Sequence, residues 1–190
     1  MYDNSFSQKF YRRTRKLLQL AIVILTIVGI AVVVWFQAQS ASKRPDIVKV
    51  GDKLPQIELL QLDGAPVTLD AATNGAMLIN LWASWCKPCI NELPLLNDAQ
   101  AFAPNVSFVA VNMQEELERI KPMIERYDLT MQVLRDEQLA WKRALGVQGY
   151  PVSVLVDANG IIQHIHVGAY TEIEEILAHT AKLASMMQDE

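Results

Sequence analysis

The sequence NLWASWCKPC, residues 80–89, lies at the junction of a predicted strand and a predicted helix. Residues 76–82 form a short, continuous apolar run after the turn-forming pair Asn74-Gly75, which predicts a buried strand. A helix that follows at once places Cys86 at its N-terminus, where unpaired N–H groups and the helix dipole favour an anion. A thiolate is the nucleophilic form of cysteine, so this stretch predicts a reactive Cys86 that can form a disulfide with Cys89.

A Cys-x-x-Cys pair is also half of many zinc sites, which usually need about four protein ligands. The chain has only two cysteines and three histidines, His164, His166 and His179. His164 and His166 alternate along a predicted strand and therefore share one face, a pattern more typical of a half-buried or solvated strand than of a ligand pair. We therefore expect redox chemistry at the cysteines, with no metal and no cofactor.

The N-terminal region combines a basic segment with an apolar one. Residues 1–16 carry a net charge of +4 in a chain of net charge −4, so the remaining 174 residues carry −8. Residues 17–36 contain Gln19 and Thr26 as their only polar members and are long enough to cross a hydrocarbon core of ~30 Å. The positive-inside rule then predicts a cytoplasmic N-terminus and an extracytoplasmic remainder.

A cleaved signal peptide is the alternative for the apolar segment, but signal peptides have apolar cores of only about 7 to 15 residues. We therefore expect a retained anchor at 17–36, a tether at 37–49 and one domain at 50–190. The acidic charge of that domain argues against nucleic acid as a partner.

Strand and helix patterns alternate along residues 50–190, which predicts an α/β sheet covered on both faces. Pro122 leaves open whether the helix within 115–127 is bent or begins near residue 121. The expected elements are a hairpin at 56–61 and 67–69, strands at 76–82, 106–111 and 130–134, helices at 87–102, 115–127 and 139–145, a hairpin at 152–156 and 161–167, and a helix at 171–187.

The motif Trp85-Cys86-Lys87-Pro88-Cys89, the following Ile90-Asn91-Glu92-Leu93-Pro94 and the later Gly149-Tyr150-Pro151 resemble the thioredoxin-like TlpA/ResA family. The CcmG or DsbE reductases of cytochrome c maturation are related to that family. The resemblance implies a thioredoxin fold with an N-terminal β-hairpin and a central strand-helix insert, preceded by one transmembrane helix. It also implies an extracytoplasmic, membrane-anchored thiol-disulfide oxidoreductase. Such an enzyme reduces client proteins such as apocytochrome c with electrons from a membrane thiol transporter.

The resemblance also assigns roles to individual residues. It implies that Cys86 attacks the client disulfide, that Cys89 resolves the mixed disulfide, and that Glu92 of the Cys-x-x-Cys-x-x-Glu pattern accepts the proton of Cys89. Thioredoxin itself has a buried Asp where this chain has Asn80, and an amide cannot exchange a proton in this range, so the task falls to Glu92. The alternative for Glu92 is a surface carboxylate in the second turn of the helix.

The same resemblance implies a client-binding surface beside the cysteines. Pro151 is expected to follow a cis peptide bond and to face the Cys-x-x-Cys, and the backbone of Tyr150 to pair with the extended client. Trp85 is expected to be an exposed contact, whereas Trp82 is expected in the core.

Three other functions remain open at this point. A copper or zinc carrier on this fold uses a Cys-x-x-x-Cys spacing, one residue longer than the spacing here. A thiol peroxidase shares the opening Val50-Gly51-Asp52-Lys53-Leu54-Pro55 but sets its cysteine in a Thr-x-x-Cys context, which Ser84-Trp85-Cys86 does not supply. The third is a non-enzymatic holdase with a vestigial motif.

Overall fold

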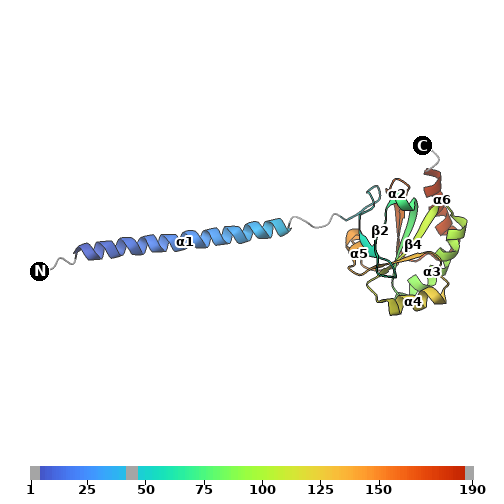
Figure 1. Cartoon of the computed structure of the whole chain (residues 1–190). Coiled ribbons are helices and arrows are strands. Elements are labelled where there is room, and N and C mark those ends of the chain that lie inside the picture. Colours follow the sequence, from blue (N-terminus) through green and yellow to red (C-terminus); the bar gives the residue numbers. More distant parts are fainter. Residues whose placement is uncertain (1–4, 42–46, 187–190) are drawn as a thin grey trace. The chain divides into compact units, whose positions relative to one another are not determined.

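The computed structural model describes residues 5–41 and 47–186, in two compact units that divide between Pro45 and Asp46 (Figure 1). The first unit contains helix α1 (Ser5–Ala41). Its segment Leu18–Phe36 is long and apolar enough to cross a membrane. The predicted anchor at 17–36 therefore falls within one continuous helix.

The helix extends beyond the expected anchor, so that the first residues of the predicted tether, 37–41, are helical. Residues 1–4 of the basic segment, 42–46 of the tether and 187 at the expected end of the last helix lie outside the described residues. At the other end of the predicted tether, the backbone N–H of Val48 donates to the carbonyl of Ala144 at 2.8 Å, so residue 48 is already part of the folded domain.

The second unit is built on a seven-stranded mixed sheet in the order β2-β1-β5-β4-β3-β6-β7. The three central strands, β5, β4 and β3, run parallel to one another, and the outer strands pair antiparallel. The strands are β1 (Glu58–Leu60), β2 (Pro66–Thr68), β3 (Ala76–Trp82), β4 (Val106–Met113), β5 (Gln132–Asp136), β6 (Val152–Val156) and β7 (Ile162–Val167). The predicted α/β sheet with an N-terminal hairpin and a central strand-helix insert is confirmed.

Strand β3 is buried along its whole length because both faces of the sheet are covered. Leu78 and Trp82 pack on one face with α3 (Lys87–Ala99) and α6 (Ile173–Met186). Met77, Ile79 and Leu81 pack on the other face, with α5 (Ala140–Leu145) and the N-terminal hairpin. A strand covered on both sides is apolar throughout, which explains the continuous apolar run of residues 76–82. Trp82 lies in the core as expected.

The helices follow the predicted order, with local differences. The predicted helix at 87–102 is α3 followed by a short 3-10 turn, η1 (Gln100–Phe102). Helix α4 (Leu117–Arg126) contains Pro122 in its interior, so it begins before residue 121. Helix α5 ends at Gly146, which adopts φ 63° as a left-handed C-terminal cap. The short helix α2 (Ala71–Asn74), whose first turn is capped by the Asp70 carboxylate, was not predicted.

Candidate redox site

Cys86 and Cys89 form a disulfide at the first turn of α3, with their Cα atoms 5.3 Å apart. Cys86 is the N-cap residue, and its Sγ accepts a hydrogen bond from the backbone N–H of Cys89 at 3.3 Å. Cys86 is 5% exposed to solvent, whereas Cys89 is 0% exposed. An incoming sulfur therefore has access to Cys86 and not to Cys89. The helix N-terminus is also where a negative charge on Cys86 would be stabilised.

The segment before Cys86 is held by a carboxylate that the sequence analysis missed. Glu115, two residues after the end of β4, accepts hydrogen bonds from the backbone N–H and the hydroxyl of Ser84, both at 2.6 Å. The side chain of Asn112 donates to the same carboxylate at 2.8 Å. The sequence placed Glu115 at the start of an amphipathic helix, and no local pattern marks it as a partner of residue 84. Its three hydrogen bonds fix the bend from which the dithiol projects.

The Tyr150–Pro151 peptide bond is cis, as the resemblance implies, and it lies against the disulfide. The carbonyl oxygen of Tyr150 is 3.5 Å from Sγ of Cys86. Trp85 is 69% exposed, and its ring centroid lies 6.0 Å from that of Tyr150. The structure therefore brings Trp85, Tyr150 and Pro151 together around the more accessible cysteine.

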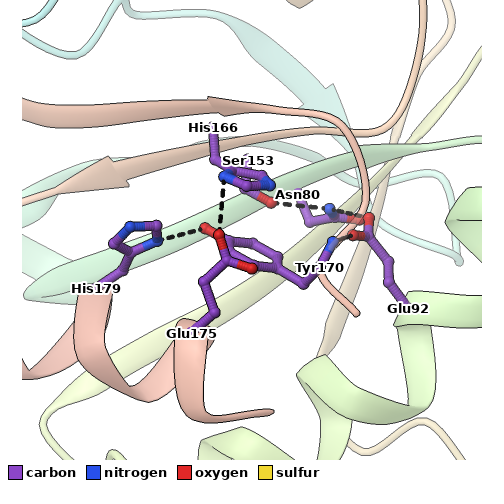
Figure 2. A network of polar contacts seen from close by, with 7 residues as sticks. All are labelled: Asn80, Glu92, Ser153, His166, Tyr170, Glu175 and His179. Atoms are coloured by element: carbon purple, nitrogen blue, oxygen red, sulfur yellow. Dashed lines mark hydrogen bonds and ion pairs between the residues drawn. The ribbon is translucent and has the colours of Figure 1, made fainter. Parts of the chain in front are cut away.

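Glu92, one turn after Cys89 on α3, is completely buried. Its Oε1 accepts a hydrogen bond from the Asn80 amide at 2.7 Å, and its Oε2 accepts one from the backbone N–H of Tyr170 at 2.8 Å (Figure 2). Burial raises the pKa of Glu92 from 4.5 to about 7, and these two hydrogen bonds oppose the rise only in part. The surface carboxylate considered as the alternative is therefore wrong, because α6 and the sheet enclose this face of α3.

Asn80 connects Glu92 to the next strand. Its amide also donates to the hydroxyl of Ser153 at 3.0 Å, and Ser153 pairs with Asn80 on one side and with His166 on the other. Figure 2 shows Ser153 between Asn80 and His166, with Tyr170 beside them. Ser153 and Tyr170 carry no local sequence signal, because the strand register that brings them to Glu92 joins segments far apart in the chain. Glu92 therefore belongs to a fixed polar network, and its carboxylate is not free to rotate into solvent.

One group in the described part of the chain has the composition of a metal site. The ring nitrogens of His164, His166 and His179 lie within 4.8 Å of one another. The sequence placed the first two on one strand face, and the fold adds the third from α6. These residues are separate from the cysteines and are considered again below.

The sheet order, the cis proline and the disulfide at a helix N-terminus define a thioredoxin-like redox protein. The comparisons with known proteins agree. The family model described as Redoxin matches residues 49–179. The chain is 32% identical over 155 residues to the thioredoxin-like protein YneN of Bacillus subtilis, covering 80% of this chain and 91% of that protein.

It is also 32% identical over 134 residues to the thiol-disulfide oxidoreductase ResA of Geobacillus thermodenitrificans, covering 70% of this chain and 76% of the relative. A crystal structure from Chlorobium tepidum, described as a candidate DsbE thiol:disulfide interchange protein, superposes with a TM-score of 0.65 at 29% identity. The match covers 72% of this chain and 98% of the chain in that crystal structure. The chain belongs to the Redoxin family and is a thiol-disulfide oxidoreductase of the TlpA/ResA type.

Proposed function

We propose that this enzyme reduces disulfides in client proteins on the outer side of a cell membrane, with α1 as its anchor. The observation that carries the proposal is the pairing of an accessible sulfur with a buried acid. Cys86 lies beside Tyr150 and keeps a small exposed fraction, whereas Glu92 is fully enclosed one turn after Cys89. This arrangement suits two successive thiol-disulfide exchanges. In the second exchange the attacking Cys89 is buried, so its proton must pass to a group inside the protein.

In the first exchange, the Cys86 thiolate attacks one sulfur of the client disulfide. A bond forms between Cys86 and the client, the client disulfide breaks, and the second client sulfur leaves as a thiolate. The start of α3 supports this step, because its N–H groups and dipole stabilise the negative charge on Cys86 before attack.

In the second exchange, Cys89 attacks Sγ of Cys86 and the remaining client thiol is released. Cys89 must lose a proton before it attacks, and we assign that proton to the Glu92 carboxylate. The pKa of Glu92, raised by burial to about 7, lets the carboxylate accept a proton near neutrality and return it afterwards. The client is then reduced by two electrons, and the enzyme holds the Cys86–Cys89 disulfide that the structure contains.

Tyr150, Pro151 and Trp85 form the proposed client-binding surface. The cis Tyr150–Pro151 bond lies next to Cys86, where a client segment in a mixed disulfide would pass. Trp85 provides an exposed aromatic surface at the edge of that path, of the kind that binds partner proteins at low entropic cost.

Apocytochrome c is the proposed client, and a membrane thiol transporter is the proposed electron donor. The similarity to ResA and to a DsbE-like structure supports thiol-disulfide exchange with protein substrates. Helix α1 supports a site at the membrane, because Leu18–Phe36 has the length and composition of a span. A net positive segment before that span favours an extracytoplasmic domain.

The test is a trap in the native membrane with Cys89→Ala, which leaves Cys86 able to attack and removes the sulfur that releases the client. Mixed disulfides should accumulate on the variant, and mass spectrometry should identify apocytochrome c among them. The matched control, Cys86→Ala, retains the buried cysteine and should trap nothing. Equal trapping by the two variants would overturn the assignment of Cys86. Trapping of other proteins without apocytochrome c would overturn the proposed client.

A further inference from the structure

All three histidines of the chain meet at one place on the surface of the domain, although they come from two elements. His164 and His166 lie on the edge strand β7, and His179 lies on α6. The rings of His164 and His179 have centroids 4.5 Å apart, and those of His166 and His179 have centroids 5.9 Å apart. The histidines are half-buried, so their ring nitrogens are held in place yet remain within reach of solvent.

Oxygen atoms complete the surroundings of this cluster. The Glu175 carboxylate lies 3.7 Å from Nδ1 of His166, and the Tyr170 hydroxyl lies 3.0 Å from Nδ1 of His179 (Figure 2). The Tyr170 ring stacks on His166 with centroids 4.0 Å apart and planes inclined by 10°. Metal-binding histidines are commonly oriented by a carboxylate or another hydrogen-bonding group in this way.

We propose that His164, His166 and His179 bind a divalent transition-metal ion of the zinc or copper(II) class, with Glu175 as the neighbouring carboxylate that orients His166. Imidazole nitrogen suits these ions, and three histidines plus one further position is a common zinc arrangement. Nitrogens around a tetrahedral zinc ion are about 3.4 Å apart, so the present separations of up to 4.8 Å must contract by roughly 1.4 Å. Small rotations of partly exposed side chains supply this movement. The site shares no residue with Cys86 or Cys89.

The experiment is a metal titration of the full-length protein in detergent, purified without a polyhistidine tag and kept oxidised. The disulfide removes both thiols as ligands, so any tight binding must come from elsewhere. Zinc chloride and copper(II) chloride are titrated separately against a chromogenic chelator. We expect one ion per chain at micromolar or lower free metal, for at least one of the two metals.

Variants then locate the ion. His179→Ala and His164→Gln should each weaken binding at least tenfold, and Glu175→Gln should weaken it by about tenfold. The matched control is Glu174→Gln, an exposed acid in the same turn of α6, which should leave the affinity unchanged. Near-ultraviolet circular dichroism checks that each variant is folded, and His164→Gln remains the test if His179→Ala is not.

Three results would overturn the proposal. The first is no binding of either metal by the oxidised protein at 100-fold excess. The second is binding that folded histidine variants retain unchanged. The third is equal loss of binding in Glu174→Gln and Glu175→Gln, which would indicate a diffuse effect of surface charge. Failure here leaves the proposed reductase function intact, because that function is tested by trapping on Cys86.

Discussion

The buried carboxyl of Glu92 should make the stability of the domain fall as the pH rises. Burial raises its pKa from 4.5 in the unfolded chain to about 7 in the folded domain, so the folded state holds the proton more tightly. The stabilisation is fully present below pH 4.5 and is lost as the pH rises through 7. A difference of about 2.5 pKa units corresponds to about 3 kcal/mol. Removal of the titrating group with Glu92→Gln should abolish this contribution.

The assay is urea unfolding of the oxidised unit that begins at Asp46, followed by tryptophan fluorescence at pH 5 and pH 8. The quantity of interest is the wild-type free energy of unfolding minus that of Glu92→Gln. Burial lowers the pKa values of the three histidines, so they also make stability depend on pH. Their contribution is the same in both proteins and cancels in this difference. The difference should fall by about 2.5 kcal/mol between pH 5 and pH 8, because part of the stabilisation is already lost at pH 5.

The exposed Glu125→Gln, on α4, is the matched control for the loss of one carboxylate, and its free energy of unfolding should stay within about 0.5 kcal/mol of the wild type. A change of less than 1 kcal/mol for Glu92→Gln would refute the raised pKa of Glu92. The assignment of Glu92 as a proton acceptor near neutrality would fall with it.

Three further substitutions test other parts of the structure. Glu115→Gln should destabilise the domain by about 2 kcal/mol in urea unfolding, because its charge-assisted hydrogen bonds to Ser84, in the segment before the dithiol, are lost. The control, the exposed Glu116→Gln, should change the free energy of unfolding by less than about 0.5 kcal/mol. Gly146→Ala should lower the melting temperature by several degrees, because the residue has φ 63° and an added Cβ would lie 2.9 Å from the Ile47 side chain. Trp85→Ala should leave the melting temperature within about 2 °C of wild type but slow mixed-disulfide formation with a protein client about tenfold, since this side chain is 69% exposed.

The sequence was sufficient where a signal is local. Residues 76–82 are apolar without interruption because β3 is covered on both faces, and the observed strand has the predicted bounds. The Cys-x-x-Cys spacing and the strand-to-helix junction placed Cys86 at the start of α3. Helix α2, with only four residues, is too short to produce a periodic pattern and was missed.

The surroundings of Glu92 could not be predicted because they are assembled from distant segments. Its partner Tyr170 lies 78 residues away in sequence, and Ser153 lies 73 residues from Asn80. These contacts depend on the order and register of β3, β6 and β7, and a single sequence does not specify a register across strands. His179 likewise reaches the two histidines of β7 only through the packing of α6 on the sheet, which the sequence alone does not specify. The redox chemistry of the Cys-x-x-Cys motif can therefore be predicted from the sequence. The residues that surround Glu92 and set its pKa can be identified only from the folded structure.

The most direct test of the account compares the two cysteines as nucleophiles. Cys89→Ser leaves only the helix-capping Cys86, and Cys86→Ser leaves only the buried Cys89. Each reduced variant is mixed with an aromatic disulfide such as 5,5′-dithiobis(2-nitrobenzoic acid) at pH 7 in a stopped-flow instrument, which records the released thiolate. We predict that Cys86 reacts at least 100-fold faster than Cys89, because it has both the exposure and the helix N-terminus. Equal rates, or a faster reaction of Cys89, would contradict the assignment of Cys86 as the attacking sulfur.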